Sequence, residues 1–335
     1  MVTCTLVKKA ANWQFFLTIN ENHKKNYYNN TMENIIDYAK KNFKTFDEEP
    51  INEVDSLILS WISYLRLPET LKSITNFRGL PLKDLYKAEY FETIFHHVYA
   101  NEQAQQLFTV LCASPRYRNI RIKAYTQQLN ESQQKQFSAM TLQINSNTHF
   151  ISFRGTDATI IGWKEDFNMI FECPLPSQKE AARYVKKVIK KTRGPLYLGG
   201  HSKGGNLAVY AAAMNHSDRV QKIYTLDGPG FFPEVLETPQ FTSITDKIQR
   251  TIPQSSIFGM VLDTNKNAQI IQSNRISFGQ HDPFSWQVED HHFVQKKQMT
   301  LDSKYINQTM QNWILLCPSF VPAAGLKPVQ KGFTK

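Results

Sequence analysis

The chain has 335 residues, of which 41% are hydrophobic and 20% are charged. A chain of this length can bury a substantial core, and its composition excludes a collagen-like, disulfide-framework or intrinsically disordered protein. Its 39 basic and 29 acidic side chains give a formal net charge of +10, which favours peripheral contact with an anionic membrane surface. The basic residues accompany no recognised nucleic-acid-binding module, so we expect no nucleic-acid partner.

The densest basic clusters are residues 116–123 and 186–191. We expect them to be solvated faces of a strand and of a helix, respectively. The four cysteines are widely spaced and form no C-x-x-C pair, which predicts neither a zinc site nor a disulfide framework. The longest apolar run, residues 207–214, is far too short to span a bilayer. A cytoplasmic location fits these features.

Residues 1–31 differ from the rest of the chain, because they are rich in Asn and Lys and show no sustained hydrophobic period. Met32 stands directly before an amphipathic helical pattern at residues 33–41. We therefore interpret residues 1–31 as a disordered arm or a start-site artefact, and residues 32–335 as one domain. Helices are predicted next within residues 51–112, with two of them at residues 82–97 and 102–111.

After Pro115 the pattern changes to alternating strands. Residues 117–125 and 136–144 predict a hairpin joined by the polar residues 127–134, and residues 149–154 predict a further strand. Strands and helices then alternate, with helices expected at 177–191 and 203–214, and strands at 196–198, 222–226, 247–252 and 269–272. This order predicts an α/β fold with a mostly parallel sheet that is covered on both faces.

The sequence around Ser202 carries the strongest chemical signal, Gly200-His201-Ser202-Lys203-Gly204. A predicted strand precedes this G-x-S-x-G pattern and a predicted helix follows it, which is the setting of a nucleophile elbow. The alternative is a phosphate-binding turn, but neither the Walker spacing nor G-x-G-x-x-G is present.

A serine nucleophile needs a base, and in this fold the chain order is serine, acid, histidine. Of the histidines after Ser202, His281 lies in a loop rich in glycine, proline and aromatic residues, which suits a positioned base. Asp227 ends a predicted strand and is the favoured acid, with Asp263 as the alternative. The N–H groups of Lys203 and of Thr156, which follows the strand at 149–154, are the candidate oxyanion donors.

These segments resemble a known family. Phe153-Arg154-Gly155-Thr156, the pair Trp163 and Asp166, and the elbow resemble the class 3 lipases. More closely, residues 32–316 resemble a bacterial lipase-like family of α/β hydrolases, through the segments WKEDFN (163–168), DGPGF (227–231), PQSS (253–256) and QHDPFSW (280–286).

The resemblance implies the α/β-hydrolase fold with a helical N-terminal cover, and it implies Ser202 as nucleophile and His281 as base. It also implies Thr156 and Lys203 as oxyanion donors. In class 3 lipases the acid lies on the strand after the one that bears Asp227, but here that strand leads into residues 253–256, which hold no carboxylate. Asp227 instead resembles the acid of pancreatic-type lipases.

The expected function is hydrolysis of carboxylic esters, with lipid acyl esters as substrates and with no cofactor or metal ion. One alternative is an inactive lipase-like scaffold that binds a lipid or a protein partner, and another is a thioesterase or peptidase with the same triad. We also expect Arg154 and Asp166 to form an ion pair behind the oxyanion loop.

A chain that begins at Met32 should fold with the stability of the full chain, because the preceding residues show no core-forming pattern. Chemical denaturation of both chains measures this. Aggregation of the shorter chain would show that residues 1–31 belong to the core.

Overall fold

The computed structural model describes residues 33–156, 162, 165, 168–169, 172–262 and 267–300. The arm expected at residues 1–31 lies outside these residues. The described part holds a sheet of eight strands in sequential order. They are β1 (Leu80–Pro81), β2 (Arg121–Asn130), β3 (Lys135–Gln143), β4 (His149–Phe153), β5 (Leu196–His201), β6 (Val220–Leu226), β7 (Ile248–Pro253) and β8 (Gln269–Ile271).

The sheet divides into an antiparallel and a parallel half. Strands β1 to β4 pair antiparallel, whereas β4 to β8 pair parallel. The hairpin expected between residues 117 and 144 is present, but its turn was predicted too early. Strand β2 continues to Asn130, which pairs with Lys135, because the polar residues at its end lie on a partly exposed ribbon where they remain hydrated.

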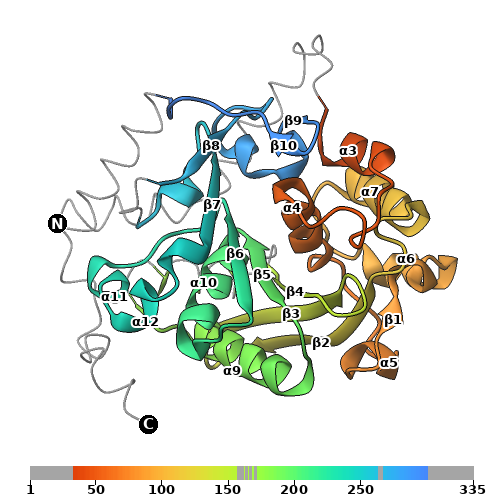
Figure 1. Ribbon diagram of the computed structural model, residues 1–335, viewed down its shortest axis with the longest axis horizontal. Helices are drawn as coiled ribbons and strands as arrows, with labels where there is room; N and C mark the ends of the chain where they lie inside the picture. The colour runs from red at the N-terminus through yellow and green to blue at the C-terminus, as the bar shows by residue number, and fades with distance from the viewer. Residues whose placement is uncertain are drawn as a thin grey trace. The chain divides into compact units, whose positions relative to one another are not determined.

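The connections between the parallel strands lie on one face of the sheet. Sequential parallel strands with right-handed crossovers place their connecting helices on the same side. Here α9 (Pro176–Lys191) and α10 (Lys203–Asn215) pack against β4, β5 and β6 in one hydrophobic core (Figure 1). The lysines of α9 at 186, 187, 190 and 191 are at least partly exposed, as expected. The short α11 (Pro233–Leu236), α12 (Pro239–Thr242) and η2 (Thr245–Lys247) complete this side.

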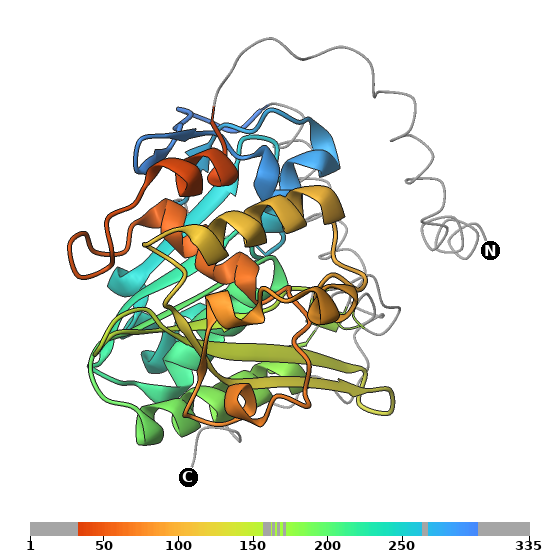
Figure 2. The same ribbon diagram turned by 90° about the vertical axis from the view of Figure 1, so that its right-hand side faces the viewer.

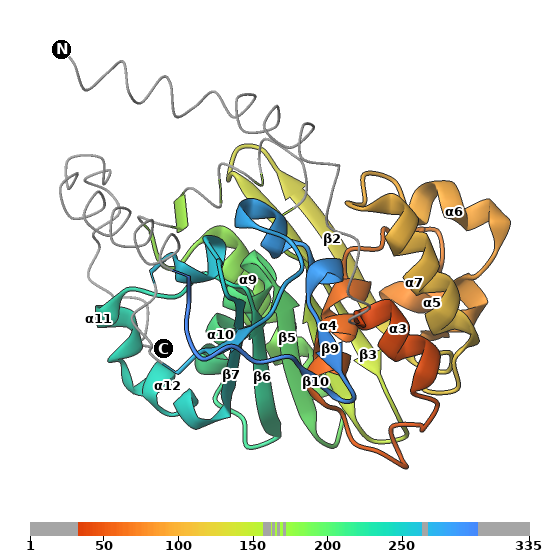
Figure 3. The same cartoon turned by 90° about the horizontal axis from the view of Figure 1, so that it is seen from above.

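The opposite face is covered by the N-terminal helices. These are α3 (Ile35–Lys41), α4 (Glu53–Ile62) and α7 (Asn101–Ala113), with α5 (Lys72–Thr75), η1 (Leu82–Leu85) and α6 (Ala88–Ile94) between them. Figures 2 and 3 show α3, α4 and α7 gathered on this side. A Cβ on Gly199 of β5 would lie 2.6 Å from the Phe150 ring and 3.1 Å from Ser60 Oγ. Glycine therefore lets α4 lie close to the strand that leads to Ser202.

The helix predicted at residues 82–97 is divided in two. The 3₁₀ segment η1 ends at Leu85 and α6 begins at Ala88. The N–H of Leu82 donates to Ile120 O at 2.8 Å, and the N–H of Lys83 donates to Arg118 O at 3.1 Å. These bonds tie the segment to the chain after α7, and the extended backbone of Lys87 (φ −135°, ψ 136°) separates it from α6.

The C-terminal part of the described chain closes over the strand ends. It comprises η3 (Phe258–Met260), η4 (Ser277–His281), η5 (Pro283–Ser285), β9 (Val288–Glu289) and β10 (His292–Phe293). Trp286 is fully buried and its indole N–H donates to Gln280 O at 2.8 Å. This bond holds the segment that carries His281. Among the described residues, no helix is long and apolar enough to cross a membrane.

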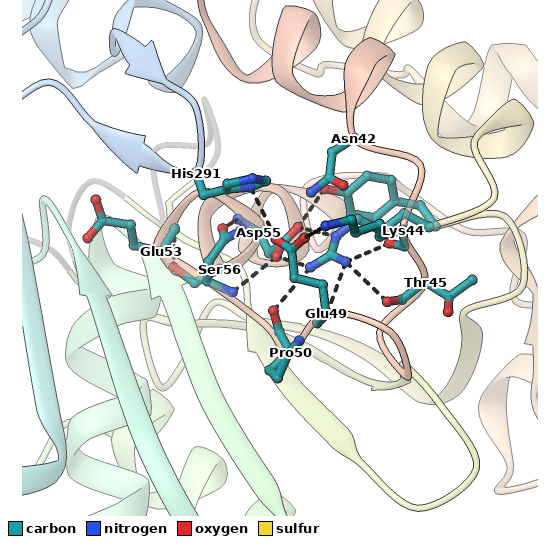
Figure 4. A network of polar contacts seen from close by, with 12 residues as sticks. Asn42, Lys44, Thr45, Glu49, Pro50, Glu53, Asp55, Ser56 and His291 are labelled. Atoms are coloured by element: carbon teal, nitrogen blue, oxygen red, sulfur yellow. Dashed lines mark hydrogen bonds and ion pairs between the residues drawn. The ribbon is translucent and has the colours of Figure 1, made fainter.

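Asp55 and Arg116 form an ion pair that is fully buried beneath the N-terminal cover. Arg116 Nε donates to Asp55 Oδ1 at 2.9 Å, and the hydroxyl of Tyr117 donates to the same oxygen at 2.6 Å. The expectation that residues 116–123 form a solvated face is therefore wrong for Arg116. Its remaining N–H groups donate to carbonyls of the loop after α3, including Lys44 O at 2.7 Å and Glu49 O at 3.1 Å (Figure 4).

The same carboxylate also begins α4. The side chain of Asn52 accepts a bond from the N–H of Asp55 at 2.9 Å, and Asp55 Oδ2 accepts one from the N–H of Asn52 at 3.0 Å. This capping box satisfies two N–H groups that the first turn of a helix leaves without partners. Burial, with the nearby Asp55 carboxylate, raises the pKa of Tyr38 to about 12, so its hydroxyl is neutral and donates to Asp55 at 3.3 Å.

We predict that Arg116→Met lowers the free energy of unfolding by about 3–5 kcal/mol, because it leaves a buried carboxylate without its cation. Arg118→Met is the matched control, since Arg118 is exposed and such a change usually costs less than about 0.5 kcal/mol. Urea denaturation measures both. Equal stability of the two variants would contradict the role assigned to the ion pair.

Candidate active site

Ser202 lies in a strained turn between β5 and α10. Its backbone has φ 59° and ψ −136°, a combination that costs a non-glycine residue about 1–3 kcal/mol. The turn is held because the N–H of Ser202 donates to Leu226 O on the neighbouring strand at 2.9 Å. This strand, turn and helix have the geometry of the elbow that the sequence predicts.

Two glycines allow the close approach of strand and helix at this turn. A Cβ on Gly200 would lie 2.2 Å from the carbonyl carbon of Gly204, and a Cβ on Gly204 would lie 2.2 Å from Phe153 O. Both distances are far below van der Waals contact, so any larger residue would push α10 away from the strands. The spacing G-x-S-x-G is thus a packing requirement of the turn.

Asp227 emerges beside Ser202 at the same edge of the sheet. In the parallel register His201 lies opposite Leu226, so Ser202 and Asp227 follow directly after paired residues of neighbouring strands. Asp227 is fully buried, and its N–H donates to Thr251 O at 2.8 Å. The side chain of Asn206 donates to Gly230 O at 2.9 Å and so ties the turn after Asp227 to α10.

The carboxylate of Asp227 contacts the ring of His281. Asp227 Oδ2 lies 2.6 Å from His281 Nδ1, so the candidate acid and the candidate base are in contact. Asp263, the alternative acid, lies outside the described residues. The other carboxylate oxygen, Asp227 Oδ1, accepts bonds from the Ser256 hydroxyl and from the N–H of Gly259, the latter at 3.1 Å. The acid is therefore held on both oxygens.

Ser256 is a part of the site that sequence reasoning missed. It lies in the PQSS segment after β7, where class 3 lipases have their acid and where this chain has no carboxylate. In this chain Ser256 supplies a hydroxyl that donates to Asp227, which follows the preceding strand β6. The absence of a carboxylate there was visible in the sequence, but the contact with Asp227 needed the fold.

The remaining histidines after Ser202 lie elsewhere. His216 is the exposed C-cap of α10, and His291 and His292 contact Glu49 and Glu53 of the cover. The His281 ring lies instead between aromatic rings, with centroids 4.4 Å from His201 and 4.2 Å from Phe258. The structure thus brings only His281 to Asp227 among the four.

Of the two expected oxyanion residues, Lys203 directly follows Ser202, and Thr156 directly follows Gly155. A Cβ on Gly155 would lie 3.1 Å from Ser202 Cβ and 2.2 Å from the hydroxyl oxygen of Tyr64, so the backbone that leads to Thr156 runs directly past the serine. Lys203 is the first residue of α10. Its N–H belongs to the first turn, where the helix dipole favours negative charge.

The Lys203 side chain is buried in an ion pair that the sequence did not indicate. Its Nζ lies 3.0 Å from Glu165 Oε2, and the two Glu165 oxygens also accept the N–H groups of Gln136 and Ser177 at 2.9 and 3.1 Å. Sequence reasoning chose Asp166 from this segment as an ionic partner of Arg154, but Asp166 and Trp163 lie outside the described residues. Arg154 is buried and donates to Gln127 Oε1 at 3.1 Å.

No group of three or more His, Cys, Asp or Glu side chains that could hold a metal ion occurs among the residues that the structure describes. The site holds the Ser202 hydroxyl on the strained turn, and the His281 imidazole in contact with the Asp227 carboxylate at 2.6 Å. A serine is activated as a nucleophile where a base of this kind comes within hydrogen-bond reach of its hydroxyl.

Comparisons with known proteins give a family and a set of distant structural likenesses. A family model described as Mbeg1-like matches residues 111–319, which is more than half of the chain. No curated protein matches the sequence.

Solved structures similar to this chain include the M37 lipase, with 13% identity, a TM-score of 0.36, and coverage of 63% of this chain and 69% of that one. The Lip2 lipase of Yarrowia lipolytica has 13% identity and a TM-score of 0.35, and the match covers 57% of this chain and 76% of the lipase. The lipase–propeptide complex of Rhizomucor miehei has 15% identity and a TM-score of 0.34, covering 59% and 71%.

We predict that Ser256→Ala lowers the free energy of unfolding by about 1.5–3 kcal/mol, because a buried carboxylate loses a hydrogen-bond donor. Ser255→Ala is the control, since the Ser255 hydroxyl contacts the neutral hydroxyl of Thr300 at 2.9 Å and its loss should cost about 1 kcal/mol. Thermal and urea unfolding measure the difference. A smaller loss for Ser256→Ala than for its neighbour would contradict the support assigned to Asp227.

Proposed function

The chain belongs to the Mbeg1-like family and has a lipase-like α/β-hydrolase fold, and from this premise we propose that it is a serine hydrolase of carboxylic esters. The observation that carries the proposal is the contact of Asp227 with His281 at the sheet edge where Ser202 stands in a strained elbow. This juxtaposition joins residues from three separate segments of the chain.

In the proposed reaction, the Ser202 hydroxyl oxygen attacks the ester carbonyl carbon while His281 Nε2 takes its proton. Asp227 accepts the Nδ1–H of His281, which keeps Nε2 unprotonated and stabilises the imidazolium that forms. The imidazolium then gives its proton to the departing alkoxide, and the carbon–oxygen bond of the ester breaks. Water then attacks the acyl-serine with the same proton transfers through His281, which releases the acid and restores Ser202.

Negative charge develops on the carbonyl oxygen during both attacks. The proposed donors are the N–H groups of Lys203 and Thr156, on either side of the nucleophile. The buried Lys203–Glu165 ion pair supports this assignment indirectly. It fixes the first residue of α10 to β3 and to the start of α9, so a donor at that residue has little freedom to move.

Apolar side chains next to the base favour an ester with an apolar acyl chain. The Phe258 ring lies 4.2 Å from that of His281 and 6.2 Å from that of Phe278. Phe278 is 41% exposed and Ile276, two residues before it, is 77% exposed. An acyl chain that leaves water at this surface gains about 25 cal/mol for each Å² of apolar area buried, which is the basis for proposing lipid acyl esters.

Replacement of Ser202 by alanine should abolish ester hydrolysis, with a loss of about a thousandfold or more. The measurements are turnover of p-nitrophenyl esters and covalent labelling by a fluorophosphonate probe. Labelling of the wild-type protein but not of Ser202→Ala supports the hydrolase. A folded wild-type protein that neither labels nor turns over ester would favour a scaffold that binds without catalysis.

Asp227→Asn should depress turnover by about ten-thousandfold, because an amide favours the wrong tautomer of the base. Asp218→Asn removes an exposed carboxylate and serves as the matched control with unchanged turnover. Steady-state kinetics on both variants test the acid assignment. Full activity of Asp227→Asn would remove Asp227 from the proposed triad.

A further inference from the structure

His201, the residue before the nucleophile, makes two side-chain hydrogen bonds that connect separate parts of the site. Its Nε2 lies 2.8 Å from the backbone carbonyl oxygen of His281. Its Nδ1 lies 3.0 Å from the hydroxyl of Tyr64, which comes from the chain just after α4 of the cover. One imidazole therefore joins the elbow, the loop of the base and the N-terminal cover.

The partners of His201 determine where its proton lies. The carbonyl of His281 can only accept, so Nε2 of His201 carries the hydrogen and donates it. In the neutral ring Nδ1 then has a lone pair, and it accepts the hydroxyl proton of Tyr64. The same hydroxyl also lies 3.4 Å from the backbone oxygen of His201. Nδ1 is the better acceptor of the hydroxyl proton, because its contact is shorter.

Burial keeps this ring neutral. His201 is 4% exposed, and burial together with the charge that His281 can carry at 4.4 Å holds the pKa of His201 well below its usual range. With its pKa held this low, His201 is a poor base and does not compete with His281 for the proton of the nucleophile. It also places no positive charge beside the imidazolium that forms on His281 during the proposed reaction.

We propose that His201 is a positioning residue, which fixes the backbone of His281 and the hydroxyl of Tyr64 against the nucleophile through a neutral, Nε2-protonated ring. The inference rests on the proposed function for its kinetic consequence. The hydrogen bonds on which it stands do not depend on that function.

Tyr64 extends this positioning to the oxyanion loop. Its hydroxyl oxygen lies 2.2 Å from the place of a Cβ on Gly155, so the tyrosine touches the backbone beside Ser202. The Tyr64 hydroxyl thereby couples the N-terminal cover to the site. An alternative interpretation makes His201 a simple packing residue, since its ring also meets Trp286 with a centroid distance of 6.0 Å.

Two substitutions of His201 separate positioning from packing. His201→Leu keeps an apolar group of similar bulk and removes both hydrogen bonds, whereas His201→Gln supplies an amide donor and a carbonyl acceptor in place of the ring nitrogens. We expect His201→Leu to lower kcat by about ten- to a hundredfold with KM changed less than about twofold, because small misplacements of a base have effects of this size. The glutamine variant should recover most of kcat.

Tyr64→Phe tests the second bond. It removes only the hydroxyl and leaves Nδ1 of His201 without that donor, so we expect a smaller fall in kcat than for His201→Leu. Activity is expressed per folded molecule, with folding measured by near-ultraviolet circular dichroism. Equal kcat in the leucine and wild-type proteins, or equal loss in the leucine and glutamine variants, would overturn the proposal.

A spectroscopic measurement keeps the inference testable without turnover. In ¹⁵N-labelled protein, His201 should remain the neutral Nε2–H tautomer between about pH 8 and pH 5, which is below the ordinary histidine pKa of about 6.5. The proton shared by His281 Nδ1 and Asp227 should give a low-field signal that persists in His201→Gln and is lost in His201→Leu.

Three results would each overturn the positioning role: an Nδ1–H tautomer of His201, protonation of His201 near pH 6.5, or a low-field signal that is unchanged in His201→Leu. Failure of wild-type labelling by a fluorophosphonate, with these signals as expected, would instead contradict the hydrolase activity alone.

Discussion

The buried ion pair of Asp55 and Arg116 anchors helix α4, which covers the face of the sheet that the crossover helices leave open. Because the parallel strands follow one another in order, their crossover helices occupy one face of the sheet only. The other face must be covered by a segment that is not a crossover, and α4 is the central element of that cover. Asp55 caps α4 and holds Arg116, and Arg116 in turn binds the carbonyls of the loop after α3. Without this network, the apolar side chains on that face of the sheet would meet water.

The elbow is held from both faces of the sheet. On the crossover side, the Lys203–Glu165 pair ties the start of α10 to β3 and α9. On the cover side, Tyr64 and His201 tie the elbow to the chain after α4 and to the His281 loop. Backbone strain at Ser202 persists only because the surroundings determine the turn so completely.

Local pattern was enough to predict the strand, turn and helix of the elbow and a mostly parallel sheet. Gly200, Ser202 and Gly204 lie within five residues, and the predicted strand and helix adjoin them directly. Asp227 and His281 could also be chosen, because the chain order of the fold restricts the candidates and each lies in a distinctive turn or loop. The ends of the strands were harder to predict. The last residues of β2 are polar, and in the sequence a polar stretch on an exposed hairpin cannot be told from a loop.

Long-range partners could not be read from the sequence. Arg116 belongs to a basic cluster, and nothing near it indicates a carboxylate 61 residues earlier. Ser256 and Tyr64 have no local pattern that points to Asp227 or His201, because those contacts exist only after the strands are aligned. Glu165 likewise has no local pattern that points to Lys203, because their contact exists only in the folded chain.

The sequential order of the strands has a consequence for the nascent chain. Proteins are synthesised from the N-terminus, and sequential strands can pair as they emerge. Helix α4, however, is completed more than a hundred residues before β5, the strand on which it lies. Arg116 can join Asp55 early and fix α4 in place, while Leu57 and Ile58 on its apolar side still lack the sheet that buries them. The growing polypeptide therefore exposes this apolar side of α4 during translation and conceals it when the fourth and fifth strands leave the ribosome.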